Sequence, residues 1–258
     1  MVRGTGVITA PIGAQANAIE VDGVSKTFHL PHEARTTIKE HFLHPWHRVT
    51  YERQVALQGV SFRVGVGEFF AIVGANGSGK STLLKILAGI YRADAGNVRV
   101  RGMMSPFIEL GVGFNPELNA RDNILINGTL LGLSRPELND RFDSILAFAE
   151  LERFVDQKLK NYSSGMQLRL AFSIAIQVPF DILLLDEVLA VGDAAFQEKC
   201  FAIFRQMKDD GKTMVFVSHD LQTVAEYCDR SLLLERGVMT AIGATDEIVA
   251  QYAAGRAG

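Results

Sequence analysis

Residues 74–82 read Gly74-Ala75-Asn76-Gly77-Ser78-Gly79-Lys80-Ser81-Thr82 and give the strongest indication of the fold. This stretch matches the phosphate-binding pattern G-x-x-x-x-G-K-[ST] without a mismatch. The apolar run Phe69–Val73 before it predicts a buried strand, and the leucines within Ser81–Leu87 predict a helix after it. A strand, a glycine-rich loop and a helix in this order are typical of a phosphate-binding site. The backbone N–H groups of the loop and the N-terminus of the helix would hold a polyphosphate.

The polar residues of this loop have predicted roles at a phosphate. Lys80 is expected to reach the β- and γ-phosphates, Ser81 to hold Mg²⁺, and Thr82 to lie at the phosphate end of the helix. The metal needs an acidic partner, and Asp186 supplies one at the end of the apolar run Ile182–Leu185. Because ligands of open parallel sheets bind at the carboxyl ends of the strands, Asp186 is expected to face the same crevice.

Two more candidate residues follow predicted strand ends. Glu187 comes directly after Asp186. A second carboxylate would crowd the metal, so the better role for Glu187 is to polarise a water aimed at the γ-phosphate. His219 follows the predicted strand Thr213–Val217, where it could contact the γ-phosphate and sense its loss. These positions predict hydrolysis of a bound nucleoside triphosphate.

Composition limits the classes of function. The 258 residues include 26 Lys and Arg against 29 Asp and Glu, which gives a formal net charge of −3. A globally basic nucleic-acid binder is excluded as the default, because phosphate contacts need a positive field. Cys200 and Cys228 do not make a disulfide framework and favour a reduced cytosolic setting. No apolar run approaches the length of a membrane span, and the first 20 residues make a poor signal peptide.

The order of elements predicts an α/β fold with a mostly parallel sheet and helices on both faces, as in a P-loop NTPase core. An N-terminal antiparallel β region is expected ahead of it, from strands at 18–21, 24–30 and 55–64. Residues Gly102–Ser164 have helical periodicity and predict a mainly helical subdomain. We expect a flexible tail at 1–17, one domain at 18–255 with an insertion at 31–54, and no additional C-terminal domain.

A further segment, Tyr162-Ser163-Ser164-Gly165-Met166-Gln167, opens a predicted helix with Ser163 or Ser164 as its N-cap. Together, GANGSGKST, YSSGMQLRLAFS, ILLLDE, AVGD and SHD resemble the motifs of an ABC-transporter nucleotide-binding subunit, over roughly Ile19 to Ala253. The signature of that family, usually written LSGGQ, is YSSGM here. Ser163 and Gly165 match it, whereas Met166 replaces the glutamine.

This resemblance implies ATP and Mg²⁺ as ligands and a homodimer of ATPase subunits. It implies that Ser163 and Gly165 contact the γ-phosphate of the ATP bound by the other copy. Asp193, in AVGD, matches the aspartate that couples the two sites. Phe28 lies where the family often stacks an aromatic ring on adenine; the alternatives are Tyr51 in that role and Phe28 as an ordinary core residue.

The segment between the P-loop and the signature departs from the family pattern. Its usual glutamine is absent from SPFIELGVGFNPELNARDNI, and Glu109 is the residue near that place that could interact with Mg²⁺ or its water. The stretch Glu109–Leu118 resembles the ELGxGFxPEL segment of exporters of lipid-linked polysaccharides and teichoic acids. YSSGM followed by LRLAF resembles the same subfamily, and so does the insertion Pro31–Gln54.

That insertion has apolar residues at helical spacing, with a basic opposite face (Ile38, Phe42, Leu43 and Trp46 among Arg35, Lys39, His41, His44, His47 and Arg48). Such a helix suits a membrane surface. In the resembling exporters a helix here lies at the cytosolic membrane boundary. The alternative is an ordinary amphipathic helix packed on the sheet. The spaced histidines are not expected to bind a metal, because Pro45 interrupts the helix and no Cys or acid completes a ligand set.

The resemblance therefore implies an ATPase subunit at the cytoplasmic face of the membrane. This subunit would drive export of a lipid-linked polysaccharide (O-antigen, capsule, galactan or teichoic-acid-like polymer) through a separate transmembrane permease dimer. The helical subdomain and the insertion would be the coupling surface. The alternatives are a transporter of a different cargo, such as a drug, lipoprotein or amino acid, and a soluble ABC ATPase acting on DNA or the ribosome. We expect no nucleic-acid partner.

Overall fold

The computed structural model describes residues 8–10, 17–31, 51–107, 111, 113–186, 193–218 and 220–256. Its strands are β1 (Ile8–Ala10), β2 (Asn17–Pro31), β3 (Tyr51–Gly65), β4 (Phe69–Val73), β5 (Ala95–Arg101), β6 (Met104–Phe107), β7 (Ile182–Asp186), β8 (Thr213–Val217), β9 (Arg230–Glu235) and β10 (Val238–Ala244). Its helices are α2 (Lys80–Leu87), α3 (Ala120–Leu130), α4 (Arg135–Ala149), α5 (Ser164–Ala175), α6 (Ala194–Asp209), α7 (Leu221–Tyr227) and α8 (Thr245–Arg256), with 3₁₀ turns at Glu152–Phe154 and Leu159–Asn161. Within the described part of the chain, no helix combines the length and the apolar character that a bilayer span requires.

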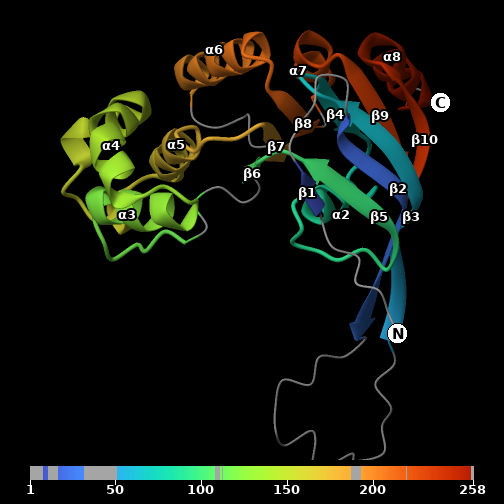
Figure 1. Cartoon of the computed structure of the whole chain (residues 1–258), viewed down its shortest axis with the longest axis horizontal. Helices are drawn as coiled ribbons and strands as arrows, with labels where there is room; N and C mark the ends of the chain where they lie inside the picture. Colours follow the sequence, from blue (N-terminus) through green and yellow to red (C-terminus); the bar gives the residue numbers. More distant parts are fainter. Residues whose placement is uncertain are drawn as a thin grey trace, which may run out of the picture.

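The strands form two sheets (Figure 1). The main sheet has the order β10-β9-β4-β8-β7-β6, and its strands run parallel except for the β9–β10 hairpin. The smaller sheet has the order β1-β5-β2-β3, in which β2 runs antiparallel to both of its neighbours. The predicted combination of a mostly parallel core and an antiparallel N-terminal region is confirmed.

The central strands are buried on both faces, as their continuous apolar sequence predicts. In β4, Phe70 and Ile72 pack into the core shared with α2 and the smaller sheet. Phe69, Ala71 and Val73 alternate with them and pack into the core under α5, α6, α7 and α8. The neighbouring strand β8 divides its side chains between the same two cores. The loop after β4 therefore starts from a strand that both cores hold in place.

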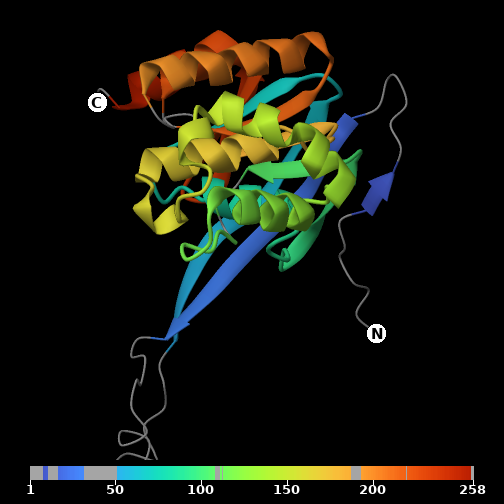
Figure 2. The ribbon, with the colours of Figure 1, turned by 90° about the vertical axis from the view of Figure 1, so that its left-hand side faces the viewer.

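Helices α3, α4 and α5, the helical arm (residues 120–175), lie to one side of the sheets (Figures 1 and 2). The arm has its own core, which includes Leu138, Ile145, Leu146 and Ala149 from the predicted helical face. Helix α5 belongs to two cores, because its Leu170 and Ile174 pack in the arm while Phe172 and Ala175 pack under the main sheet. Through α5 the arm is continuous with the sheet that carries the phosphate loop.

Strands β2 and β3 form a long ladder that projects beyond the rest of the molecule (Figure 2). The two short strands predicted at 18–21 and 24–30 are one continuous strand, β2. Gly23, with φ +60°, falls where the pairing register of β2 shifts, so the strand bends there without ending. Pro31 pairs with Tyr51 at the far end of the ladder, and the remainder of the predicted insertion, residues 32–50, lies outside the described residues.

Several elements are not among the sequence predictions. Strand β6 lies inside the region predicted as helical; it forms the edge of the main sheet, where Pro106 is tolerated. Strand β5 and the seven-residue helix α7 are also additions, because short or half-exposed elements have little periodicity. Ile8–Ala10, inside the segment 1–17 expected to be a flexible tail, pairs in parallel with the edge of β5. Unpaired backbone groups on a strand edge favour such an added strand.

Both cysteines are free and buried, Cys200 on α6 and Cys228 after α7. Burial raises the pKa of each thiol to about 12. At pH 8 only about one thiol in ten thousand would be the reactive thiolate. We therefore expect iodoacetamide to label neither cysteine in the folded protein and both in guanidinium chloride, as measured by intact mass. Rapid labelling of the folded chain would contradict the packing described around them.

Candidate nucleotide site

The loop between β4 and α2 has the shape that its glycines predict. A Cβ added at Gly74 would lie 2.2 Å from the carbonyl oxygen of Leu234, and one added at Gly79 would lie 2.5 Å from that of Ala56. Gly79 also has φ +108°, which disfavours any residue with a side chain. The backbone N–H of Gly237 donates to the carbonyl of Ser78 at 2.8 Å, so the β9–β10 turn supports the loop. Glycine is therefore required here for close packing of the loop against β9 and β3.

Lys80 is the first residue of α2, directly after the loop. It is 5% exposed, and its Nζ donates to the carbonyl oxygens of Gly74 at 2.9 Å and Ala75 at 3.0 Å. These hydrogen bonds hold the ammonium group inside the ring of backbone N–H groups that would surround a phosphate. The positive charge and the N-terminus of α2 both favour an anion at this place.

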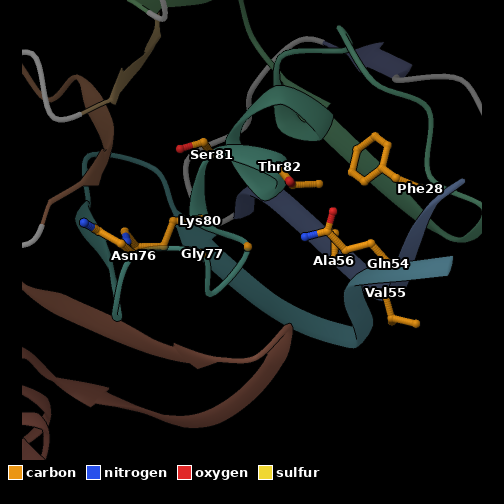
Figure 3. Close-up of a pocket in the computed structure, with 10 residues that line it drawn as sticks. Phe28, Gln54, Val55, Ala56, Asn76, Gly77, Lys80, Ser81 and Thr82 are labelled. Carbon is orange, nitrogen blue, oxygen red and sulfur yellow. The ribbon is translucent and has the colours of Figure 1, made fainter. Parts of the chain in front are cut away.

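A pocket of about 370 Å³ opens beside the loop (Figure 3). It is lined by Asn76, Gly77, Gly79, Lys80, Ser81 and Thr82 from the loop and α2, and by Phe28, Gln54, Val55 and Ala56 from β2 and β3. Phe28 thus lies at the end of the pocket away from the phosphate loop, where the resemblance places the base. It has edge contact with Tyr91, with ring centroids 5.6 Å apart. The side chain of Tyr51, the alternative, lies outside the described residues.

The predicted metal ligands fit a magnesium ion. Asp186 is the last residue of β7, two strands from β4 in the order β4-β8-β7, or about 10 Å across the sheet. Ser81 is exposed in the pocket. Among the described residues, no group of three or more His, Cys, Asp or Glu side chains could hold a metal. Mg²⁺ needs no such cage, because it keeps water and phosphate oxygens and takes one or two protein ligands. A hydroxyl and a carboxylate at this edge are a donor set of that type.

Three predicted residues, Glu109, Glu187 and His219, lie outside the described residues. The chain around them is described on at least one side. Glu187 follows Asp186 at the end of β7, and His219 follows Ser218, which is buried after β8. Since β8 lies between β4 and β7, Asp186 and Ser218, the described residues that precede them, lie at the same edge of the sheet as the phosphate loop.

The signature segment is anchored in the helical arm. Ser163 is the N-cap of α5, and its Oγ accepts a hydrogen bond from the backbone N–H of Met166 at 3.2 Å. The side chain of Met166 packs against the core of the arm, which explains how an apolar residue fits at this position. The next residue, Gln167, donates through Nε2 to the carbonyls of Leu159 at 3.2 Å and Tyr162 at 3.4 Å. Gln167 thus fixes the turn that presents Ser163 and Gly165.

The segment Asn115–Leu118 is tied to the chain leading into this signature. The backbone N–H groups of Leu159 and Lys160 donate to the carbonyls of Leu118 and Pro116, each at 2.9 Å. Glu117 pairs with Lys158 and Lys160, and these two lysines lower its pKa. The ELGxGFxPEL-like stretch, where it is described, therefore contacts the residues that immediately precede the signature segment.

Asp193 already has partners within its own chain. Its Oδ1 accepts from the backbone N–H of Phe196 at 3.0 Å, which caps α6, and its Oδ2 pairs with Arg169 of α5. The capping bond and then Arg169 lower its pKa. Arg169 also pairs with Glu150 at 3.0 Å, and Glu150 pairs with Lys199. Asp193 thus joins α6 to the arm, an arrangement that the sequence pattern did not reveal.

No residue of the helical arm is among those that line the pocket of the phosphate loop. Ser163 is the N-cap of α5 and Gly165 lies in its first turn, within the arm, whereas α2 packs against the opposite face of β7 and β8. A single chain therefore carries the phosphate loop and the capped N-terminus of α5 at two separate places.

Comparisons with known proteins agree with this geometry. Residues 57–190 match the family model described as ABC transporter. The chain is 42% identical over 237 residues to the O-antigen export system ATP-binding protein RfbB of Klebsiella pneumoniae, covering 91% of this chain and 96% of that protein. It is 44% identical over 197 residues to the teichoic acids export ATP-binding protein TagH of Levilactobacillus brevis, covering 76% of this chain and 54% of TagH.

Solved structures give the same fold. The dimeric structure of a bacterial ABC transporter cassette superposes with a TM-score of 0.68 at 25% identity, covering 88% of this chain and 98% of that one. The ATP-binding subunit of an ABC transporter superposes with a TM-score of 0.71 at 22% identity, covering 92% of this chain and 93% of that one.

Proposed function

We propose, since this chain belongs to the ABC transporter family, that it is the ATP-hydrolysing subunit of an exporter of lipid-linked polysaccharide. The observation that carries the proposal is its similarity to an O-antigen export ATP-binding protein over nearly the whole length of both chains. The phosphate loop, the pocket beside it and the anchored signature segment support the ATPase part of the proposal.

Each residue of the proposed site has a separate role in nucleotide binding or hydrolysis. The backbone of Gly77–Gly79 and the ammonium group of Lys80 hold the phosphates, and Phe28 stacks on the base. Ser81 and Asp186 would hold Mg²⁺, which when bound neutralises phosphate charge. Glu187 accepts the proton of the attacking water, and His219 contacts the terminal phosphate. Glu109 is proposed as a further contact of the metal or its water.

Two copies are proposed to close head to tail on two ATP molecules. The separation of Ser163 and Gly165 from their own chain's pocket supports this, because their helix N-terminus is left to bind the partner's γ-phosphate. The similarity to a dimeric cassette supports the same assembly. Asp193, which joins α5 to α6, would transmit closure from one site to the other. ATP would then favour the closed dimer, and hydrolysis would reopen it.

The cargo and the membrane partner are the finer part of the proposal. The printed names of RfbB and TagH are those of export-system ATP-binding proteins for O-antigen and teichoic acids. We propose that this chain works at the cytoplasmic face of the membrane with a separate transmembrane permease dimer. The contacts of Asn115–Leu118 with Lys158–Lys160 support the proposal that movement at the surface of the helical arm is transmitted to the signature segment. Residues 32–50 of the insertion are proposed to lie at the membrane surface, since Tyr51–Gln54 belong to β3.

A transporter of a different cargo is the second candidate. The chain is also 42% identical over 238 residues to the ABC transporter protein AbcA of Aeromonas salmonicida, whose name states no cargo. Lipid-linked polysaccharide remains the favoured cargo because the names of RfbB and TagH state export of O-antigen and of teichoic acids.

Depletion of the protein in its native cell tests the cargo. We expect a lipid-linked polymer to accumulate in the cytosol-facing leaflet, as measured by lipid extraction and glycan analysis. The parent chain and Lys85→Ala should restore export, whereas Lys80→Ala should not. Lys85 is the control because it lies on the same helix but does not line the pocket. Normal polymer export after depletion, with another compound retained instead, would favour the second candidate.

A further inference from the structure

The side chain of Gln54 lies in the nucleotide pocket without an assigned role. Gln54 of β3 pairs directly with Phe28 of β2 in the antiparallel ladder. Directly opposite residues of a ladder project from the same face of the sheet, with Cβ atoms about 5 Å apart. Both side chains line the pocket, and Figure 3 shows the Gln54 amide extending from β3 toward α2 and the phosphate loop. A base stacked on Phe28 would therefore have this amide at its edge.

Among the described residues that line this end of the pocket, no other side chain has a polar group for a base. Phe28, Val55 and Ala56 are apolar, while Asn76, Ser81 and Thr82 belong to the phosphate loop and α2. Gln54 is exposed, and none of the hydrogen bonds found among the described residues uses its amide. Its carbonyl acceptor and its N–H₂ donors are thus available to a ligand.

We infer that Gln54 hydrogen-bonds to the 6-amino edge of an adenine base stacked on Phe28. This edge presents an N–H donor beside a ring-nitrogen acceptor, which matches the acceptor and donor of a glutamine amide. Phe28 can stack on the face of any base, whereas Gln54 distinguishes bases by the hydrogen-bonding groups on their edge. The inference rests on the proposed function, because it requires ATP in this pocket.

The test removes each partner of the hydrogen bond separately. The full-length parent chain and Gln54→Ala are titrated, in Mg²⁺, with ATP and with purine riboside 5′-triphosphate, which lacks only the 6-amino group. We expect the parent to bind ATP about 3- to 10-fold more tightly than the analogue, the range of one net hydrogen bond. In Gln54→Ala this ratio should fall below about 2, because ATP loses both hydrogen bonds to the amide whereas the analogue, which keeps the ring nitrogen, loses only one.

Two variants keep the result specific to the base edge. Gln58→Ala is the matched control, since Gln58 is an exposed glutamine on the same strand that does not line the pocket. It should behave as the parent. Phe28→Ala should weaken both nucleotides by a similar factor. Such an equal loss distinguishes stacking from edge recognition.

Three outcomes would overturn the inference. One is a Gln54→Ala variant that keeps the full preference for ATP over the analogue. Another is an equal loss for both nucleotides, and the third is coupling of Gln54 to the 2′-hydroxyl, measured with 2′-deoxy-ATP. Failure of the proposed function has a different signature. In that case the parent chain itself would bind neither nucleotide, and the inference would fail with it.

Discussion

Lys80→Ala should abolish ATP turnover and weaken ATP binding by at least about 30-fold, equivalent to about 2 kcal/mol for the loss of a buried charged partner. Lys80 is 5% exposed, and its ammonium group already donates to the carbonyls of Gly74 and Ala75. An alanine leaves the β- and γ-phosphates without their only positive side chain from the pocket lining that the structure describes. Calorimetric titration with Mg-ATP and a phosphate-release assay measure the two effects.

Lys85→Ala is the matched control for this variant. Lys85 is on the last turn of the same helix, and its Nζ lies 5.6 Å from the ring centroid of Tyr91. It should keep the affinity and turnover of the parent. Circular dichroism checks that Lys80→Ala is folded. A folded Lys80→Ala chain that binds ATP as the parent does would refute the phosphate role of Lys80.

Glu187→Gln should lower turnover by about 100-fold or more, the usual contribution of a general base, while ATP binding is kept. The amide has nearly the same shape as the carboxylate but cannot accept the proton of the attacking water. Because hydrolysis is what reopens the proposed dimer, the variant should accumulate as an ATP-bound dimer. Light scattering coupled to size-exclusion chromatography, with and without Mg-ATP, measures this species.

Glu226→Gln provides the comparison, since Glu226 is an exposed acid on α7 that does not line the pocket. It should hydrolyse ATP at the parental rate and remain in the parental monomer–dimer distribution. Parental turnover by Glu187→Gln would show that another group is the general base. Loss of binding together with turnover would instead place Glu187 among the residues that hold the nucleotide.

The sequence alone was sufficient for the parts of the fold with strong local patterns. Phe69–Val73 and Thr213–Val217 are strands with the predicted bounds, because apolar runs of this length between turn residues suit a sheet buried on both faces. Ser163 is the N-cap, one of the two serines considered, and its Oγ has the expected bond to the third residue beyond it.

Long-range pairing was beyond the sequence patterns. Strand β6 forms because the edge of β7 is open for pairing. Its four residues include a proline and have no sequence pattern that predicts a strand. Likewise, the pairing of Asp193 with Arg169 and of Arg169 with Glu150 joins positions that are well separated in sequence. The pattern AVGD identified Asp193 as a candidate but contained nothing about its partners on α5. Gln54 was missed for the same reason, since only the ladder register places it beside Phe28.

The double-sided burial of β4 has a consequence for genetics. Phe70 and Ala71 never meet a nucleotide, yet each faces a different core, and the phosphate loop begins three residues later. A clinical or laboratory allele that enlarges or shrinks either side chain would produce a transport-negative strain with an intact catalytic motif. A genetic screen that classifies such alleles as active-site mutations would assign the defect to catalysis when its cause is core packing. Their phenotype should ease at lower growth temperature, as is common for folding defects and uncommon for lost chemistry.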